Sequence, residues 1–180
     1  MGRDFFKQRL ELAVGSRIAA CFRAIMVTMS TTPAPIPAEQ LTQMWDAARA
    51  AQTRAYAPYS RYAVGAAILD DQGLVHAGCN VENAAYPQGW CAEASALAAL
   101  VMSGSRRARA VLVLGGAGGD GGGATGGDWI TPCGGCRQKL REFCDPEVPI
   151  QSATADALGP VYTLDQLLPH SFGPGHLKTP

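Results

Sequence analysis

The sequence contains Cys91-Ala92-Glu93 and, about forty residues later, Pro132-Cys133-Gly134-Gly135-Cys136. Three cysteines at this spacing can supply three thiolate ligands to one zinc ion. Three protein ligands leave the fourth tetrahedral position open to water, which is typical of a catalytic rather than a structural zinc site. Glu93 lies two residues from a ligand, so its carboxylate can face that water without binding the metal. The spacing therefore predicts one catalytic zinc per chain.

Glu93 is the candidate proton carrier of this site. Zinc lowers the pKa of a bound water from about 15.7 to about 7, and a ligand-x-Glu motif followed by Pro-Cys-x-x-Cys is the signature of zinc deaminases. In such an enzyme Glu93 accepts the water proton and passes protons to the ring nitrogen and to the departing ammonia. Alternatively, the helix dipole alone favours an acidic residue in a first helical turn. The cysteine spacing favours the catalytic role.

Three further features bear on the metal. Both cysteine motifs are expected at helix N-termini, where the partial positive charge stabilises thiolate. Arg137 directly follows Cys136 and is predicted to offset the negative charge of three thiolates, although a solvated helix residue is an equal alternative. A structural four-cysteine site would need Cys79 or Cys144 as its fourth ligand. Neither belongs to a second Cys-x-x-Cys pair, which disfavours that reading.

Composition limits the class of protein. The chain has 180 residues, a formal net charge of zero and 47% hydrophobic residues, typical of one globular domain. Residues 36–180 contain ten basic and thirteen acidic residues, a poor surface for a nucleic-acid backbone. The absence of an apolar run of about 18 residues argues against a membrane span. Thiolate ligands must stay reduced, so we expect a cytoplasmic protein.

The chain divides into three predicted parts. Residues 1–35 form an N-terminal extension, either poorly ordered or preceding the true start of translation. A Pro-rich linker at 31–37 leads into a catalytic domain at 36–173, followed by a C-terminal tail at 174–180. Nine glycines fall within residues 115–127. We interpret that stretch as a flexible surface insertion rather than a phosphate-binding loop, because no Gly-Lys-Ser/Thr follows it.

Hydrophobic periodicity predicts an α/β domain. Strands are expected at 62–69, 74–81, 110–114, 148–154 and 161–163, with a turn at 70–73 joining the first two. Helices are expected at 36–55, 91–103 and 133–144, with a last helical turn at 165–168. This order indicates a mixed five-stranded sheet covered by helices on both faces.

Further stretches extend the pattern beyond the cysteines, and together the chain resembles the small homotetrameric cytidine deaminases. In chain order the matching stretches are Tyr56–Ala66 (YAPYSRYAVGA), Gly78–Ala84 (GCNVENA), Cys91–Glu93 (CAE), Pro132–Gln138 (PCGGCRQ) and Leu167–Pro174 (LLPHSFGP). They follow the order found in that family. The resemblance covers about residues 38–177 and implies a cytidine-deaminase-like fold.

The resemblance also implies substrate contacts. Asn80 and Glu82 correspond to residues that hold the ribose hydroxyls, and a carboxylate is a strong acceptor for such a group. Tyr62 matches an aromatic position near the base, and the backbone of Ala92 is expected to bond the base. Phe172 resembles an aromatic residue that reaches into a neighbouring subunit's pocket, so a homotetramer with shared active sites is implied. Alternatively, Tyr62 is a core aromatic and Phe172 anchors the C-terminus.

One departure concerns the zinc site. The family often has arginine directly after the catalytic Glu, whereas this chain has Ala94, which leaves Arg137 as the nearby cation. The expected function is zinc-dependent hydrolytic deamination of cytidine and deoxycytidine, in pyrimidine salvage. Alternatives are a deaminase of another aminated heterocycle such as a nucleoside antibiotic, a non-catalytic structural zinc module, and a polynucleotide-editing deaminase. Asn80 and Glu82 argue against the first, Glu93 against the second, and the lack of a basic stripe against the third.

Overall fold

The computed structural model describes residues 33–116 and 129–177. The N-terminal extension up to residue 32 and residues 117–128 of the Gly-rich insertion lie outside the described residues. The strands are β1 (Val64–Asp70), β2 (Val75–Cys79), β3 (Ala108–Gly115), β4 (Pro149–Ala153) and β5 (Leu158–Thr163). The helices are α2 (Ala38–Gln52), α3 (Ala92–Met102), α4 (Gly134–Leu140) and α5 (Leu164–Leu167), with short 3₁₀ turns at Tyr86–Gln88 and Pro174–His176.

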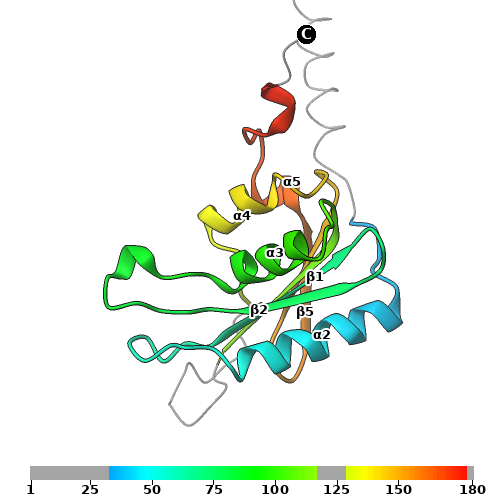
Figure 1. The fold of residues 1–180 in the computed structure, drawn as a ribbon. Helices are drawn as coiled ribbons and strands as arrows, with labels where there is room; N and C mark the ends of the chain where they lie inside the picture. Colours follow the sequence, from blue (N-terminus) through cyan, green and yellow to red (C-terminus); the bar gives the residue numbers. More distant parts are fainter. Residues whose placement is uncertain (1–32, 117–128, 178–180) are drawn as a thin grey trace, which may run out of the picture. The chain divides into compact units, whose positions relative to one another are not determined.

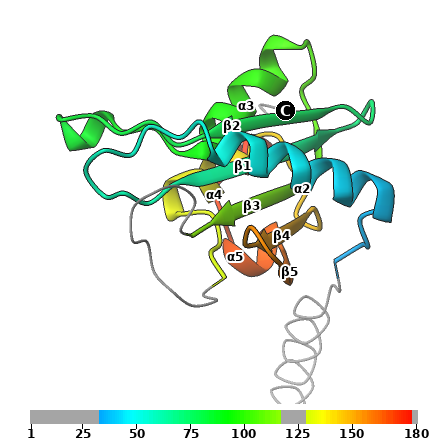
Figure 2. The same cartoon turned by 90° about the horizontal axis from the view of Figure 1, so that it is seen from below.

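The described residues form one mixed sheet in the order β2-β1-β3-β4-β5. Strands β3 and β4 run parallel, and the other neighbours are antiparallel. Helix α2 packs against β1, β2 and β3 on one face, while α3 and α4 lie on the opposite face (Figures 1 and 2). The predicted five-stranded sheet covered on both faces is therefore confirmed. Within residues 33–116 and 129–177, no helix combines the length and apolar composition needed to span a bilayer.

Both faces of the sheet are buried, and the side chains of β1 and β3 alternate between them as pleated strands require. Met44 and Ala48 of α2 pack with one set of strand residues, which is Ala67, Leu69, Ala110, Leu112 and Leu114. Helix α3 packs with the alternate set, which includes Ala66, Ile68, Val111 and Val113. The near-continuous apolar runs of these strands follow from this two-sided burial.

Two glycines allow the helices to lie directly on the sheet. A Cβ at Gly65 would lie 2.0 Å from the carbonyl oxygen of Ala48 in α2. A Cβ at Gly78 would lie 2.4 Å from the amide nitrogen of Ala96 and 2.6 Å from the carbonyl oxygen of Ala92, both in α3. Gly78 therefore fixes how closely the first turns of α3 approach β2.

Gly78→Ala is expected to lower the free energy of unfolding by about 1–3 kcal/mol, because the added methyl overpacks backbone atoms that cannot rotate away. Urea unfolding followed by circular dichroism measures this. Gly175→Ala is the matched control, since a Cβ there would meet nothing within 4 Å. Equal stability of the two variants would contradict the close packing of α3 on β2.

Element boundaries differ from the sequence-based expectation by up to four residues. The helix predicted at 133–144 ends at Leu140, because Cys144 forms a parallel bridge with Ala108 and the amide of Ala108 donates to the carbonyl of Phe143 at 2.9 Å. Strand β5 begins at Leu158 rather than 161. It is an edge strand, where its Pro160 is tolerated because one side of the strand has no ladder partner.

Candidate metal centre and active-site cavity

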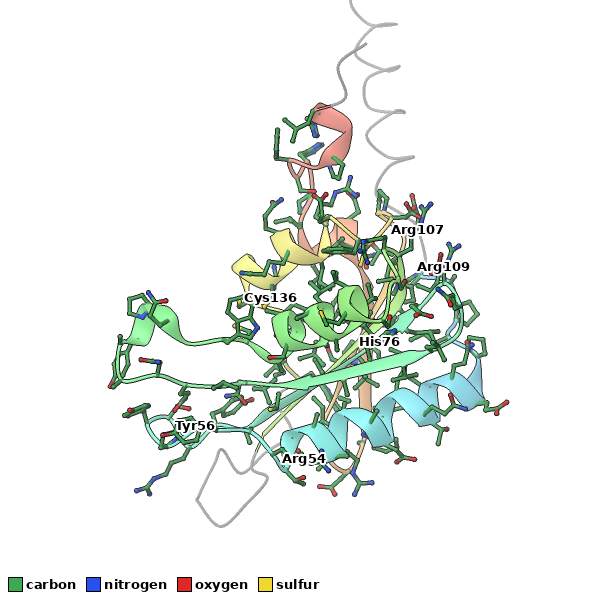
Figure 3. All side chains as sticks on the ribbon, viewed as in Figure 1. Arg54, Tyr56, His76, Arg107, Arg109 and Cys136 are labelled. Carbon is green, nitrogen blue, oxygen red and sulfur yellow. The ribbon has the colours of Figure 1, made fainter. Side chains whose placement is uncertain are left out.

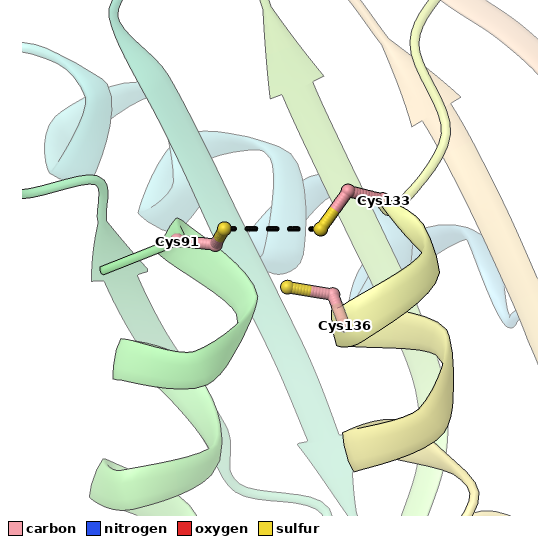
Figure 4. A group of neighbouring side chains, drawn as sticks. All are labelled: Cys91, Cys133 and Cys136. Atoms are coloured by element: carbon pink, nitrogen blue, oxygen red, sulfur yellow. Dashed lines mark hydrogen bonds between the residues drawn. The ribbon is translucent and has the colours of Figure 1, made fainter. Parts of the chain in front are cut away.

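The two cysteine motifs meet at the N-terminal ends of two helices. Cys91 is the N-cap of α3, Cys133 is the N-cap of α4, and Cys136 lies in the first turn of α4. Their three Sγ atoms point toward one another (Figure 4) and lie within 4.8 Å of one another. Cys136 is buried, and Figure 3 marks its place on α4 on the side of the sheet opposite α2.

The spacing of the sulfur atoms fits a zinc ion. A tetrahedral zinc with Zn–S bonds of about 2.3 Å requires sulfur atoms about 3.8 Å apart. The Sγ atoms of Cys91 and Cys133 are 3.9 Å apart. Three thiols from two helices thus form a group that can hold one metal ion with little rearrangement.

The pKa values of the three thiols indicate that the cluster favours a bound cation. Burial raises the pKa of Cys136, and the nearby charge of Glu93 raises it further. Burial also raises the pKa of Cys91. At Cys133 burial is outweighed by hydrogen bonds, chiefly from the backbone N–H of Cys136, and the pKa is lowered. A dication bound between the sulfur atoms would offset the burial and the repulsion that raise the pKa values of Cys91 and Cys136.

Glu93 is buried beside the cluster. Its side chain is 4% exposed, and the Cys136 thiol donates to its Oε2 at 3.4 Å. It lies in the first turn of α3, where the helix dipole stabilises a carboxylate. A buried carboxylate at this distance from the sulfur atoms is placed to exchange protons with a group bound at the metal.

A cavity of about 380 Å³ opens over the cluster. It is lined by Cys91, Glu93 and Cys133 together with the predicted substrate-binding residues Asn80, Glu82 and Ala92. Segments far apart in the sequence therefore converge on one space, and its volume is in the range of small-molecule sites. Ala92 is fully buried, so it can offer only backbone groups near the cavity.

Asn80 and Glu82 are held by the segment that precedes β1. The side-chain amide of Asn80 accepts from the Val64 N–H at 2.8 Å and donates to the Tyr62 carbonyl at 2.9 Å. The carboxylate of Glu82 accepts from the backbone N–H groups of Tyr59 and Ser60 at 2.9 and 3.2 Å and from the Ser60 hydroxyl. The Ser60 hydroxyl is the main cause that lowers the pKa of Glu82, which keeps this acceptor ionised.

The two predicted aromatic contacts lie apart from the lining of this cavity. Tyr62 is half-buried, and its hydroxyl would lie 2.9 Å from a Cβ built on Gly115. Phe172 is 57% exposed and stacks on His176 with ring centroids 5.1 Å apart. Gln138 of α4 donates to the Phe172 carbonyl at 2.9 Å, so the tail is attached to the helix that carries Cys136. Substrate contact by either ring stays a prediction.

Arg137 supports the loop that leads into α4. Its guanidinium donates to the carbonyls of Pro132 and Leu167 at 2.7 and 2.8 Å and to the hydroxyl of Thr131 at 2.9 Å. These contacts fix the segment that delivers Cys133. Its predicted role in offsetting thiolate charge stays a prediction. Ala94 is buried in α3.

Sequence reasoning missed several residues of the cavity. Its lining also includes Val64, Tyr86, Trp90, Ile130 and Thr131. Trp90 directly precedes Cys91 and is 50% exposed. Its place directly before a predicted metal ligand was the signal that the sequence offered. Tyr86 and Ile130 come from loops whose position depends on the folded sheet.

Fold and site together define a zinc-dependent hydrolytic deaminase. Residues 38–152 match the model of the cytidine and deoxycytidylate deaminase zinc-binding region. The cytidine deaminase of Sporosarcina psychrophila is 36% identical over 122 residues, which is 68% of this chain and 83% of the relative. A cytidine deaminase of Mycobacterium tuberculosis is 41% identical over 119 residues, 66% of this chain and 79% of the relative.

Solved structures agree with these relatives. The crystal structure of cytidine deaminase from Burkholderia pseudomallei has a TM-score of 0.63 and 37% identity, covering 73% of this chain and 98% of that chain. That from Mycobacterium tuberculosis has a TM-score of 0.61 and 38% identity, covering 74% and 97%. The chain belongs to the cytidine and deoxycytidylate deaminase family.

Proposed function

We propose that the chain catalyses the hydrolytic deamination of cytidine and deoxycytidine to uridine and deoxyuridine, with release of ammonia. One observation favours this function over the alternatives. A single cavity is lined both by the thiols and buried Glu93 of the metal cluster and by Asn80 and Glu82, which are suited to a sugar. A structural zinc site requires neither the buried carboxylate of Glu93 nor a cavity over the metal.

The residues of the chain divide the chemistry between them. Cys91, Cys133 and Cys136 would hold the zinc, which when bound supplies a water that loses its proton near neutral pH. Glu93 accepts that proton and delivers it to ring N3 as the water oxygen adds to C4. It then takes the second proton, from the new hydroxyl on C4, and passes it to the amine. The C4–N bond breaks as the C4 hydroxyl becomes the C4=O carbonyl, and the protonated amine leaves as ammonia. Burial of Glu93 excludes bulk water from these transfers.

Incubation of the purified protein with cytidine, deoxycytidine and cytidine monophosphate in parallel tests the proposal. Loss of the cytosine absorbance, with ammonia measured independently, is expected for the two nucleosides. The monophosphate is expected to react poorly, because the ionised carboxylate of Glu82 repels a phosphate. No deamination of either nucleoside by zinc-loaded protein would refute the proposed function.

Self-association into a homotetramer belongs to the same proposal. An open groove of about 520 Å³ between α3 and α4 is lined mainly by apolar side chains, including Trp90, Leu97, Val101 and Phe143. Met102 in the same groove is 86% exposed. Contiguous exposed apolar surface of this kind is typical of protein–protein interfaces, and a second copy of the chain is the proposed occupant.

Phe172→Ala is expected to raise KM for cytidine about fivefold while the melting temperature changes little, because aromatic packing on the base contributes about 1 kcal/mol. Sedimentation of the wild type, together with kinetics of the variant, measures both parts of the proposal. Leu177→Ala is the control, because Leu177 is also an exposed apolar residue of the tail. A drop in melting temperature with unchanged KM would identify Phe172 as an anchor instead, and a fully active monomer would contradict shared sites.

The chemistry supports a proposal for the cellular setting. Free cytosine nucleosides are the substrates of pyrimidine salvage, and we place this chain in that process. Three thiolate ligands are stable only where thiols stay reduced, so a cytoplasmic location is proposed.

A further inference from the structure

We propose that Ser60 is a positioning residue for substrate binding, which sets the orientation of the Glu82 carboxylate toward a sugar hydroxyl. This inference deepens the proposed function and rests on it, because it takes Glu82 as the residue that binds the sugar. Ser60 itself lies outside the lining of the cavity over the cysteines, whereas Glu82 lines both that cavity and an adjoining one of about 370 Å³.

The carboxylate of Glu82 is held by one short turn. Its Oε2 accepts from the backbone N–H groups of Tyr59 and Ser60 at 2.9 and 3.2 Å. Its Oε1 accepts from the hydroxyl of Ser60. The same hydroxyl oxygen accepts from the N–H of Tyr62 at 3.0 Å, so the direction of its proton toward Glu82 is fixed.

The turn has little freedom of its own. The amide of Arg61 donates to the carbonyl of Ala57 at 3.0 Å, and Arg61 has a left-handed φ of 58°. A non-glycine residue adopts this conformation only where its surroundings impose it. The residue that precedes this turn, Tyr56 (labelled in Figure 3), forms a backbone bridge with Val81. Val81 lies between Asn80 and Glu82, the two proposed sugar-binding residues. The donors that face Glu82 are therefore rigidly placed.

Counting hydrogen-bond sites shows what this arrangement leaves for a ligand. An ionised carboxylate offers about four acceptor positions, and the turn occupies two on Oε2 and one on Oε1. The remaining position on Oε1 is the one available to a substrate hydroxyl. Loss of the Ser60 hydroxyl would free Oε1 and allow the carboxylate to rotate away from the cavity.

Ser60 also links Glu82 to the second proposed sugar-binding residue. Its hydroxyl holds the N–H of Tyr62, and the carbonyl of Tyr62 accepts from the side-chain amide of Asn80 at 2.9 Å. One short segment therefore sets the orientation of both side chains. A hydroxyl that both donates and accepts is required at position 60 for this link, which Ser and Thr provide and Ala does not.

Kinetics with two substrates test the role of Ser60. Ser60→Ala is expected to raise KM for cytidine about three- to tenfold, the loss of one hydrogen bond, with kcat nearly unchanged because ground-state and transition-state binding weaken together. For 2′,3′-dideoxycytidine, which keeps the base and lacks both ring hydroxyls, kcat/KM of the variant is expected to equal that of the wild type. Ser60→Thr restores the preference for cytidine. Ser103→Ala is the control, since its hydroxyl donates to the Leu100 carbonyl at the end of α3.

The outcomes separate this inference from the function on which it rests. Equal losses on both substrates would make Ser60 a merely structural residue and overturn the inference, while deamination itself stands. Losses from Glu82→Gln and Ser60→Ala that add fully in the double variant would also overturn it, because the whole effect of Ser60 would then bypass Glu82. A wild type that does not prefer cytidine to its dideoxy analogue would overturn both the inference and the sugar contact of Glu82.

Discussion

Glu93→Gln is expected to lower kcat for cytidine by about 100- to 10,000-fold, the usual contribution of a general acid–base group. Glutamine preserves the shape of the buried side chain and cannot carry protons between the water, ring N3 and the amine. Zinc content is expected to stay at one per chain, because the sulfur atoms that would bind the metal are untouched. Steady-state kinetics and elemental analysis of the same preparation measure the two effects.

Glu39→Gln supplies the matched control for this variant. Glu39 is also an acidic residue in the first turn of a helix, α2, on the opposite face of the sheet. If Glu93 served only to complement a helix dipole, the two substitutions would have similar small effects. A Glu93→Gln enzyme that retains more than about a tenth of wild-type turnover would remove Glu93 from the mechanism.

The metal cluster could be predicted from sequence because each of its two halves is a local motif. Cys133 and Cys136 share one helical turn, and Cys91 and Glu93 lie together at the N-terminus of another helix. The sheet was also predictable, since β1 and β3 are apolar runs bounded by polar turns. In both cases each part is encoded within a short stretch of sequence, and the fold brings the parts together.

The features that could not be predicted from sequence depend on contacts between distant segments. The helix at 134–140 ends where Cys144 pairs with Ala108, and no propensity within the helix encodes that pairing. The role proposed for Ser60 is likewise invisible in sequence, because its partner Glu82 is 22 residues away and the pairing of Tyr56 with Val81 helps to bring the two together. Tertiary contacts override local preference at these positions.

Replacing any one of Cys91, Cys133 and Cys136 by alanine is expected to reduce zinc from one per chain to below about a tenth, and to abolish deamination. Two thiolates cannot satisfy a tetrahedral zinc, and metal binding by such a site is coupled to folding. The melting temperature is therefore expected to fall with zinc content and to become insensitive to chelator. Elemental analysis and thermal unfolding with and without chelator measure these effects.

Cys144→Ala separates loss of metal from loss of a buried thiol. Cys144 is 5% exposed, against 1% for Cys136, and packs in the core on the same face of the sheet. Its removal leaves a small cavity and lowers stability, yet zinc should remain at one per chain and chelator should still lower the melting temperature. Loss of a buried thiol alone is therefore not expected to cause the loss of zinc and of chelator sensitivity that is expected for the three ligand variants. Full metal occupancy after loss of any of the three, or two metals in the wild type, would refute the assignment.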